Sequence, residues 1–276
     1  MAEPIRVMVV GAAGKMGREV VKAIAGAPDL KLVAAVDPAH PGEDAGELAG
    51  AGRLGVSCEG ELETALRERG AEVMVDFTRP DGLAERIAAA LRNGVRPVVG
   101  TTGLAKGELE RVGALAAEKG LGCIVAPNFA IGALVLMRCA ALAARYFGQV
   151  EIVELHHPGK LDAPSGTAIK TAELIAEARQ QAGVTVTPTP GAETERIAGA
   201  RGGEYSGVRV HSVRLPGLVA HQEVLFGNPG EYLTFRHDSL SRESFMPGVL
   251  LAVRAVRNLS GLVYGLEPLV FGPQTA

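Results

Sequence analysis

The sequence contains no tryptophan, and Phe and Tyr account for only 4% of its 276 residues. Proteins that stack nucleic-acid bases and proteins with an aromatic membrane belt both depend on such side chains. Its charge is also nearly balanced, with 28 Lys and Arg against 31 Asp and Glu and a net charge of -3. A chain of this charge has no general attraction for phosphate backbones or anionic lipid. We therefore expect no nucleic-acid partner and no membrane.

Cysteine is scarce as well, with only Cys58, Cys123 and Cys139 in the chain. An odd number cannot all pair, and two of the three lie in apolar runs where buried free thiols are usual. The N-terminus lacks the basic and apolar regions of a signal peptide, and Arg138 interrupts the most apolar helical run. These features predict a reduced, cytoplasmic protein.

Apolar residues make up 47% of the chain and recur in a regular order in its first half. Short β-branched runs alternate with longer segments that have helical spacing. The expected strands are residues 5–10, 32–36, 72–77, 97–99 and 121–125, and the expected helices are residues 18–25, 80–93 and 106–119. This alternation predicts an α/β domain with a Rossmann-type, doubly wound parallel sheet.

The second half has a different pattern, typical of an α+β domain. Helices are expected at 131–146 and 167–181, and strands at 150–156, 208–215, 222–226 and 232–237, the last two forming a hairpin. Residues 185–207 indicate a long exposed connection, and a helix at 245–258 is expected to return to the first domain. We therefore predict a dinucleotide-binding domain at 1–129 and 240–276 and a substrate-binding, oligomerisation domain at 130–239.

A glycine-rich turn joins the first expected strand to the first helix. Gly11, Gly14 and Gly17 are spaced Gly-x-x-Gly-x-x-Gly, with Ala12, Ala13, Lys15 and Met16 between them. Such glycines permit a tight turn, close approach of a pyrophosphate and close helix packing. Asp37, which ends the second strand, is placed to bind the adenosine ribose. The turn predicts NADH or NADPH as cofactor, and a plain connecting turn is the alternative.

The choice between the two cofactors stays open on these residues. Asp37 would repel a 2′-phosphate, whereas Lys15 would attract one. Two further turns, Phe77-Thr78 and Gly100-Thr101-Thr102-Gly103, follow expected strands at the edge where open α/β sheets bind ligands. They are candidates for the nicotinamide ribose, and ordinary loops with Thr helix caps are the alternative.

The densest set of reactive side chains lies between Glu154 and Thr167. His156, His157 and Lys160 are candidate proton donors for a product that has received a hydride. Ser165, Gly166 and Thr167 open a helix whose N–H groups can bind a carboxylate. A zinc site would need three or four convergent ligands, and a hydrolytic Ser165 would need a Gly-x-Ser-x-Gly elbow, so we expect neither.

The alternative is a purely structural role for this segment, as a polar loop followed by a helix capped at Asp162 or Ser165. The other histidines near expected strands, His211, His221 and His237, have no comparable neighbours in the sequence. For these three a structural role is favoured.

Five segments together resemble the 4-hydroxy-tetrahydrodipicolinate reductase family, also called dihydrodipicolinate reductases. They are VGAAGKMGRE (10–19), DFTRP (76–80), VVGTTG (98–103), APNFAIG (126–132) and ELHHPGKLDAPSGTA (154–168). The resemblance implies reduction of a cyclic imine dicarboxylate by NADH or NADPH in the diaminopimelate route to lysine. It also implies a homotetramer assembled through the sheet of the second domain.

The resemblance further implies roles for individual residues. His156 and Lys160 would be catalytic, and His157, Lys160, Ser165, Gly166 and Thr167 would bind the substrate. The cofactor would be held by Gly11, Ala12, Ala13, Gly14, Lys15, Met16, Asp37, Phe77, Gly100, Thr101, Thr102, Ala126, Pro127, Asn128 and Phe129. No residue is expected to bind a metal.

The chain departs from some relatives at two places. Pro38 stands where an arginine can pair with a 2′-phosphate, and Pro158-Gly159 replaces two basic residues. The rival functions are a semialdehyde dehydrogenase of the same architecture and a module that senses NAD(H) without turnover. The first would need a reactive cysteine in an electropositive loop, which the sequence lacks.

Overall fold

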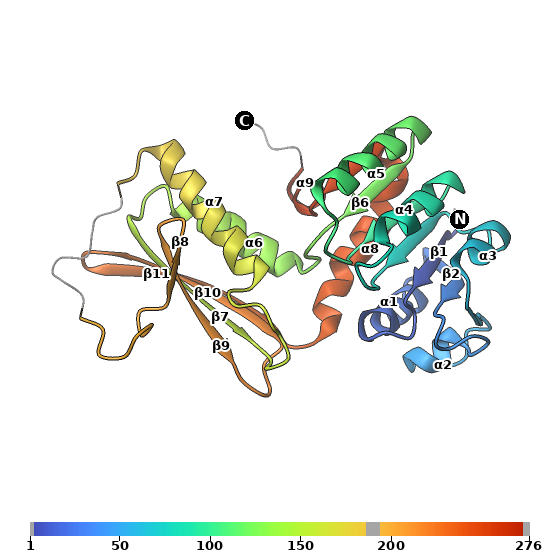
Figure 1. Ribbon diagram of the computed structural model, residues 1–276, viewed down its shortest axis with the longest axis horizontal. Coiled ribbons are helices and arrows are strands. Elements are labelled where there is room, and N and C mark those ends of the chain that lie inside the picture. Colours follow the sequence, from blue (N-terminus) through green and yellow to red (C-terminus); the bar gives the residue numbers. More distant parts are fainter. Residues whose placement is uncertain (1–2, 186–193, 273–276) are drawn as a thin grey trace. The chain divides into compact units, whose positions relative to one another are not determined.

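The computed structural model describes residues 3–185 and 194–272. The chain forms two compact units. Unit 1 consists of Met1–Ala130 together with Phe245–Ala276, and unit 2 consists of Ile131–Ser244. The chain therefore leaves the first unit once and returns to it (Figure 1).

Unit 1 contains a seven-stranded sheet with the strand order β12-β6-β5-β4-β1-β2-β3. Every pair of neighbouring strands in it is parallel. The strands are β1 (Ile5–Val10), β2 (Leu30–Val36), β3 (Cys58–Glu59), β4 (Val73–Asp76), β5 (Arg96–Val99), β6 (Gly122–Val125) and β12 (Gly261–Tyr264). The order reverses beside β1, which confirms the Rossmann-type, doubly wound prediction.

Helices bury both faces of this sheet. Met8 and Met74 pack with α3 (Leu62–Glu68) and α4 (Leu83–Arg92) on one face. Their neighbours Val7, Val9 and Val73 are also fully buried, on the other face. This is why the strands are continuous apolar runs instead of alternating patterns. The helices of the unit are α1 (Lys15–Ala25), α2 (Ala45–Ala49), α3 (Leu62–Glu68), α4 (Leu83–Arg92), α5 (Lys106–Lys119), α8 (Met246–Ala255) and α9 (Glu267–Phe271).

The returning C-terminal segment adds more than the predicted helix. Residues 245–258 form the end of the 3-10 turn η1 (Arg242–Phe245), then α8 and the turn η2 (Val256–Asn258). They are followed by β12, which the sequence analysis missed and which pairs with β6. Four residues beginning with a glycine give almost no strand signal, so the open edge of β6 decides this element. The elements α2, β3 and α3 were missed as well, because segments this short carry little periodic signal.

Unit 2 contains a five-stranded mixed sheet with the order β11-β10-β7-β9-β8. Its strands are β7 (Gln149–His156), β8 (Gly203–Tyr205), β9 (Val208–Arg214), β10 (Ala220–Asn228) and β11 (Glu231–Ser239). The helices α6 (Ile131–Ala143) and α7 (Gly166–Ala182) pack on one face of the sheet (Figure 1). This confirms the α+β prediction and the hairpin, whose strands pair from Asn228 and Glu231 outward.

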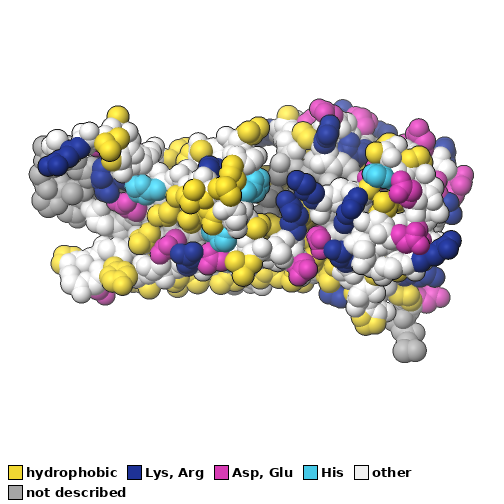
Figure 2. Space-filling view, turned by 90° about the horizontal axis from the view of Figure 1, so that it is seen from below, with side chains coloured by type: hydrophobic (Ala, Val, Ile, Leu, Met, Phe, Trp, Pro, Cys, Tyr) yellow, Lys and Arg dark blue, Asp and Glu magenta, His cyan; other side chains and the backbone are white. Residues whose placement is uncertain are grey.

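The opposite face of the unit 2 sheet carries half-buried apolar side chains, Val153, Leu155, Val213 and Leu225, which alternate with the buried ones. In the space-filling view from below, hydrophobic side chains gather there beside histidines and charges of both signs (Figure 2). Neither α6 nor α7 covers this face.

The prediction of a long exposed connection at 185–207 is wrong near the end of that range, because β8 lies there and pairs antiparallel with β9. Residues 186–193 of that prediction lie outside the described residues. In the described part of the chain, no helix is long and apolar enough to cross a membrane. All three cysteines are free thiols, with Cys139 only partly buried.

Candidate active site

The turn after β1 contains two glycines, Gly11 and Gly17, that no other residue could replace without rearrangement. Gly11 has a positive φ of 76°, and a Cβ on Gly17 would lie 2.0 Å from the carbonyl oxygen of Gly11. The α1 helix therefore starts directly against the strand end, as the spacing predicts.

The first turn of α1 leaves backbone donors available. Gly14 caps the helix without a side-chain hydrogen bond, so the N–H groups of Lys15, Met16 and Gly17 point out of the helix start. The 11-residue helix also adds the positive end of its dipole. A phosphate group fits these donors, whereas a turn that served only to connect two elements would gain from a capping side chain.

Asp37 fixes the same turn from the next strand. Its Oδ2 accepts a hydrogen bond from the N–H of Ala13 over 2.9 Å, and Oδ1 accepts one from Ala39 over 3.1 Å. The carboxylate thus lies beside the glycine turn at the end of β2, where a ribose hydroxyl could reach it.

A buried carboxylate, Asp76, organises the next two loops. It ends β4 with no exposed surface, and its Oδ2 accepts a hydrogen bond from Nε of Arg86 over 2.8 Å. Its Oδ1 accepts hydrogen bonds from the hydroxyls of Thr78 at 2.6 Å and Thr101 at 2.9 Å. The Thr101 hydroxyl is therefore used within the protein, which leaves the backbone of this loop to face a ligand.

Sequence reasoning missed both Asp76 and Arg86. The signal was an acidic residue at the end of an apolar strand followed by an arginine in the next helix.

An aromatic pair lies beside these loops. The rings of Phe77 and Phe129 are 5.5 Å apart between centroids, and a Cβ on Gly100 would meet the Phe77 ring at 2.0 Å. Gly100 is thus required for the ring to lie across the β5 loop. Thr102 and Pro127 are exposed, Ala126 is buried, and Asn128 accepts a hydrogen bond from the N–H of Ala130.

All the predicted cofactor residues follow the carboxyl ends of parallel strands. Gly11 follows β1, Asp37 follows β2, Phe77 follows β4, Gly100 follows β5 and Ala126 follows β6. The sheet brings these segments, which are far apart in the sequence, to one edge. This edge is where an open α/β sheet binds a ligand.

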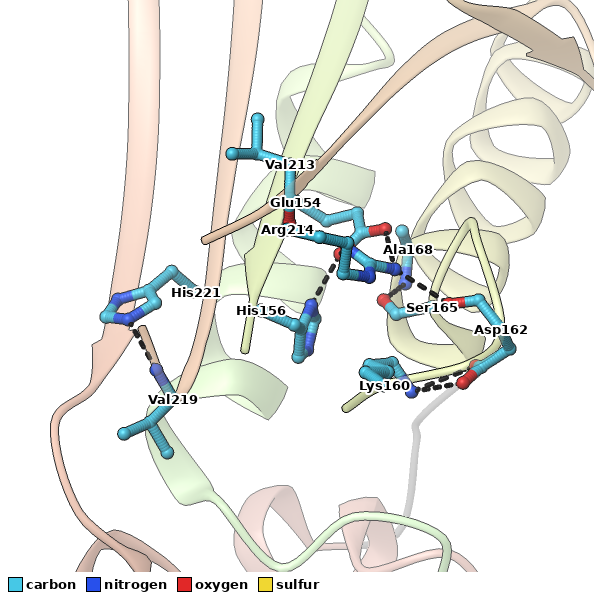
Figure 3. Close-up of polar contacts among 10 residues, drawn as sticks. All are labelled: Glu154, His156, Lys160, Asp162, Ser165, Ala168, Val213, Arg214, Val219 and His221. Atoms are coloured by element: carbon cyan, nitrogen blue, oxygen red, sulfur yellow. Dashed lines mark hydrogen bonds and ion pairs between the residues drawn. The ribbon is translucent and has the colours of Figure 1, made fainter. Parts of the chain in front are cut away.

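In unit 2 the predicted catalytic histidine belongs to a charged network at the end of β7 (Figure 3). Nδ1 of His156 lies 2.5 Å from Oε2 of Glu154, whose side chain is fully buried. Arg214, the last residue of β9, donates to both carboxylate oxygens of Glu154, over 2.8 and 2.9 Å. The parallel pairing of β7 with β9 brings the three side chains together.

The charge state of Glu154 follows from these contacts. Burial opposes ionisation, but hydrogen bonds from His156, Arg214 and Ser212 outweigh it and lower the pKa of Glu154 to about 2. An ionised carboxylate can only accept hydrogen bonds. The proton between the two groups therefore belongs to Nδ1 of His156, and Nε2 is the nitrogen left for chemistry.

Lys160 lies in the loop after β7 and binds Asp162. Its Nζ donates to both carboxylate oxygens, over 2.8 and 2.9 Å. The hydrogen bond from Lys160 lowers the pKa of Asp162. Figure 3 shows Lys160 and His156 on the same side of the network.

The start of α7 completes this region. Ser165 is the buried N-cap, and its Oγ accepts a hydrogen bond from the N–H of Ala168 over 3.2 Å. Gly166 is exposed, and a Cβ on it would enter open space. The capped-helix interpretation is therefore correct for Ser165, and it coexists with a helix start that is open to an anion. His157 is exposed.

Two of the other histidines of unit 2 pair with carboxylates. His211 pairs with Glu151 over 2.7 Å, and Nδ1 of His221 pairs with Asp238 over 2.7 Å. Burial lowers the pKa of His237. Among the described residues, no three His, Cys, Asp or Glu side chains form a group that could hold a metal ion.

Comparison with known proteins places this arrangement in one family. The family model described as dihydrodipicolinate reductase, N-terminus, matches residues 5–129, and its C-terminus counterpart matches residues 132–270. The chain belongs to the dihydrodipicolinate reductase family. This confirms the resemblance given by the five sequence segments.

Members of the family match over nearly their full length. The 4-hydroxy-tetrahydrodipicolinate reductase of Synechocystis is 53% identical over 96% of this chain and 98% of its own. A solved dihydrodipicolinate reductase from Paenisporosarcina sp. TG-14, bound to dipicolinate, has a TM-score of 0.82 and 45% identity over 96% of this chain and 98% of its own.

A more distant solved structure shares the fold alone. An amine dehydrogenase from Mycobacterium smegmatis has a TM-score of 0.65 at 16% identity, over 99% of this chain and 97% of its own.

Proposed function

We propose that this chain reduces 4-hydroxy-tetrahydrodipicolinate to tetrahydrodipicolinate with NADH or NADPH, a step in the diaminopimelate route to lysine. Family membership supports the reaction. The observation that carries it for this chain is the set of groups around the end of β7. An oriented imidazole, an ammonium group and a helix start lie together there.

The unit 1 turn and loops are proposed to hold the cofactor. The turn from Gly11 to Met16 holds the pyrophosphate, with the backbone N–H groups of Lys15 and Met16 at the start of α1 as donors, and Asp37 binds the adenosine ribose. Phe77, Gly100, Thr101, Thr102 and Ala126, Pro127, Asn128 and Phe129 line the nicotinamide end. When bound, the nicotinamide supplies a hydride.

The unit 2 loop is proposed to hold a dicarboxylate. Dipicolinate, which the Paenisporosarcina relative binds, is a dicarboxylate. In this chain the ammonium of Lys160 and the N–H groups at the start of α7 supply complementary charge and donors for carboxylates. His157, Ser165, Gly166 and Thr167 are the remaining proposed contacts.

His156 is proposed to transfer the proton. Glu154 holds the Nδ1 proton, so in the protonated ring the second proton is on Nε2; it passes to the reduced substrate or to the departing hydroxyl and leaves the neutral ring protonated on Nδ1. Lys160 stabilises the developing negative charge from the loop.

We also propose that the enzyme is a cytoplasmic homotetramer. The uncovered face of the unit 2 sheet, with Val153, Leu155, Val213 and Leu225, supports association of copies through this sheet. The free thiols support a reducing compartment.

The test follows absorbance at 340 nm with purified protein and NADH or NADPH. The substrate is made in the cuvette by condensing aspartate semialdehyde and pyruvate with the preceding synthase. Substrate-dependent loss of absorbance is expected, and the ratio of the two rates gives the cofactor preference. Cofactor binding without this loss would instead support a sensing module.

The semialdehyde dehydrogenase alternative is disfavoured by the state of the thiols. Burial and nearby carboxylates raise the pKa of Cys58 to about 11, and burial raises the pKa of Cys123 to about 12. Neither thiol forms the thiolate that a thiohemiacetal mechanism needs at neutral pH.

A further inference from the structure

Arg214 contacts the surroundings of both proposed catalytic residues, although it stands at the end of a different strand. Its Nη1 and Nη2 each donate to one oxygen of Glu154, which in turn accepts the Nδ1 hydrogen bond of His156. Nη2 also donates to the backbone oxygen of Asp162 over 2.7 Å, and the Asp162 carboxylate holds Lys160. One guanidinium thus binds both Glu154, which holds His156, and Asp162, which holds Lys160 (Figure 3).

The pairing with Glu154 has an electrostatic consequence. An uncompensated carboxylate beside an imidazole favours the protonated ring, which makes it a reluctant proton donor. Arg214 compensates the buried charge of Glu154 through two parallel hydrogen bonds, a geometry that only arginine offers. Glu154 therefore fixes the Nδ1 proton without trapping the ring as imidazolium.

The contact with Asp162 has a geometric consequence. The loop after β7 carries Lys160 and leads to the start of α7, and Arg214 fastens its backbone to the end of β9. A further hydrogen bond from Nη1 to the backbone oxygen of Val213 over 2.8 Å fixes the guanidinium itself. Arg214 therefore holds both the loop that carries Lys160 and, through Glu154, the side chain of His156.

We propose that Arg214, acting through Glu154 and Asp162, is the positioning residue that sets the proton affinity of His156 and the place of Lys160. This inference rests on the proposed reductase function. The charged or titratable groups drawn with His156 in Figure 3 are Glu154 from β7, Arg214 from β9, Lys160 and Asp162 from the loop, and His221 from β10.

Two substitutions separate the charge of Arg214 from its geometry. Arg214→Gln removes the charge, and we expect kcat to fall roughly 10- to 100-fold, a part of what general acid catalysis contributes. The alkaline limb of the kcat/KM profile should also move up by about one pH unit, since Glu154 is left uncompensated. Arg214→Lys keeps the charge, so the alkaline limb should stay in place and kcat should fall less than in Arg214→Gln. Some fall in kcat remains, because lysine cannot donate to Glu154 and Asp162 at the same time as the arginine fork does.

The matched control is Arg254→Gln. Arg254 makes the same two-oxygen pairing, with Asp29 in unit 1, at 2.7 and 2.9 Å. Its removal should leave kcat and the pH profile unchanged. Thermal unfolding and fluorescence titration with NADH establish that each variant is folded.

A second readout does not depend on turnover. The imidazole of His156 is followed by NMR of protein carrying ¹⁵N-histidine, with its signals assigned by comparison with His156→Gln. Its titration midpoint should rise in Arg214→Gln and stay near the wild-type value in Arg214→Lys. A wild type that fails to oxidise NADH or NADPH would overturn the reductase function, yet this titration would still test the coupling.

Two results would overturn the inference. One is an Arg214→Gln protein that keeps the wild-type kcat and pH profile. The other is a variant that loses thermal stability and activity together without any change in the His156 titration, which would make Arg214 a purely structural residue.

Discussion

Oδ2 of Asp37 accepts a hydrogen bond from the backbone N–H of Ala13 over 2.9 Å, so the end of β2 holds the glycine turn that follows β1. The residue proposed to bind the ribose also shapes the proposed phosphate site. Its loss should therefore affect the whole adenosine end of the cofactor.

Asp37→Asn should weaken NADH binding about tenfold, because a charged hydrogen bond contributes roughly 1.5 kcal/mol or more. Binding of NADPH should weaken less, since the variant no longer repels a 2′-phosphate. Fluorescence titration with both cofactors measures the two affinities. Asp29→Asn, at the amino-terminal edge of the sheet, is the control, and equal weakening for both cofactors would contradict the role of the charge.

Gly17→Ala should destabilise unit 1 by about 3 kcal/mol or force the turn to shift, because the new Cβ would overlap the Gly11 carbonyl oxygen. Gly107→Ala is the matched control in α5, where a Cβ meets nothing within 4 Å. There the alanine should be neutral or slightly stabilising. Thermal unfolding of both variants makes the comparison, and similar midpoints would show that the turn tolerates a side chain.

Asp76→Asn should reduce stability by about 3 kcal/mol or more, since it leaves Arg86 facing a neutral group in a buried network. The loops that carry Thr78 and Thr101 should loosen, so the KM for NADH should rise as well. Unfolding and steady-state kinetics measure the two effects. An unchanged KM in a destabilised protein would limit Asp76 to the core.

His156→Gln should lower kcat by about 100-fold or more and leave the Kd for NADH unchanged, because a proton donor is lost from a unit that does not carry the glycine turn. His157→Gln is the comparison, because His157 is the next residue in the sequence and its side chain is exposed. That variant should act mainly on the KM of the dicarboxylate. If the kcat of His156→Gln stayed as high as that of His157→Gln, His156 would not be the residue that transfers the proton.

The buried Glu154 should make unit 2 sensitive to acid. Its pKa is lowered from 4.5 to about 2, so its ionised form stabilises the fold above pH 4.5. That contribution is lost progressively as the pH falls from 4.5 toward 2. Unfolding midpoints across this range should decline less steeply in Glu154→Gln than in wild type, and parallel curves would contradict the assignment.

The local patterns of the chain determined most of unit 1. Apolar runs bounded by glycine or acidic residues predicted β1, β2, β4, β5 and β6, because strands buried on both faces need nothing beyond continuous apolar side chains. The Gly11, Gly14 and Gly17 spacing likewise predicted the turn, since its steric demands are local. The five segments that include the motif around His156 and Lys160 were together sufficient for the family and the proposed reaction.

Only the tertiary structure decided what supports these residues. Arg214 lies far from Glu154 in the sequence, and nothing local marks it as the partner of a buried carboxylate. Asp76 and Arg86 are brought together by the strand-to-helix packing, and β12 exists because β6 offers an unpaired edge. Ion pairs and edge strands depend on which groups meet in space, and short-range sequence patterns carry no record of those meetings.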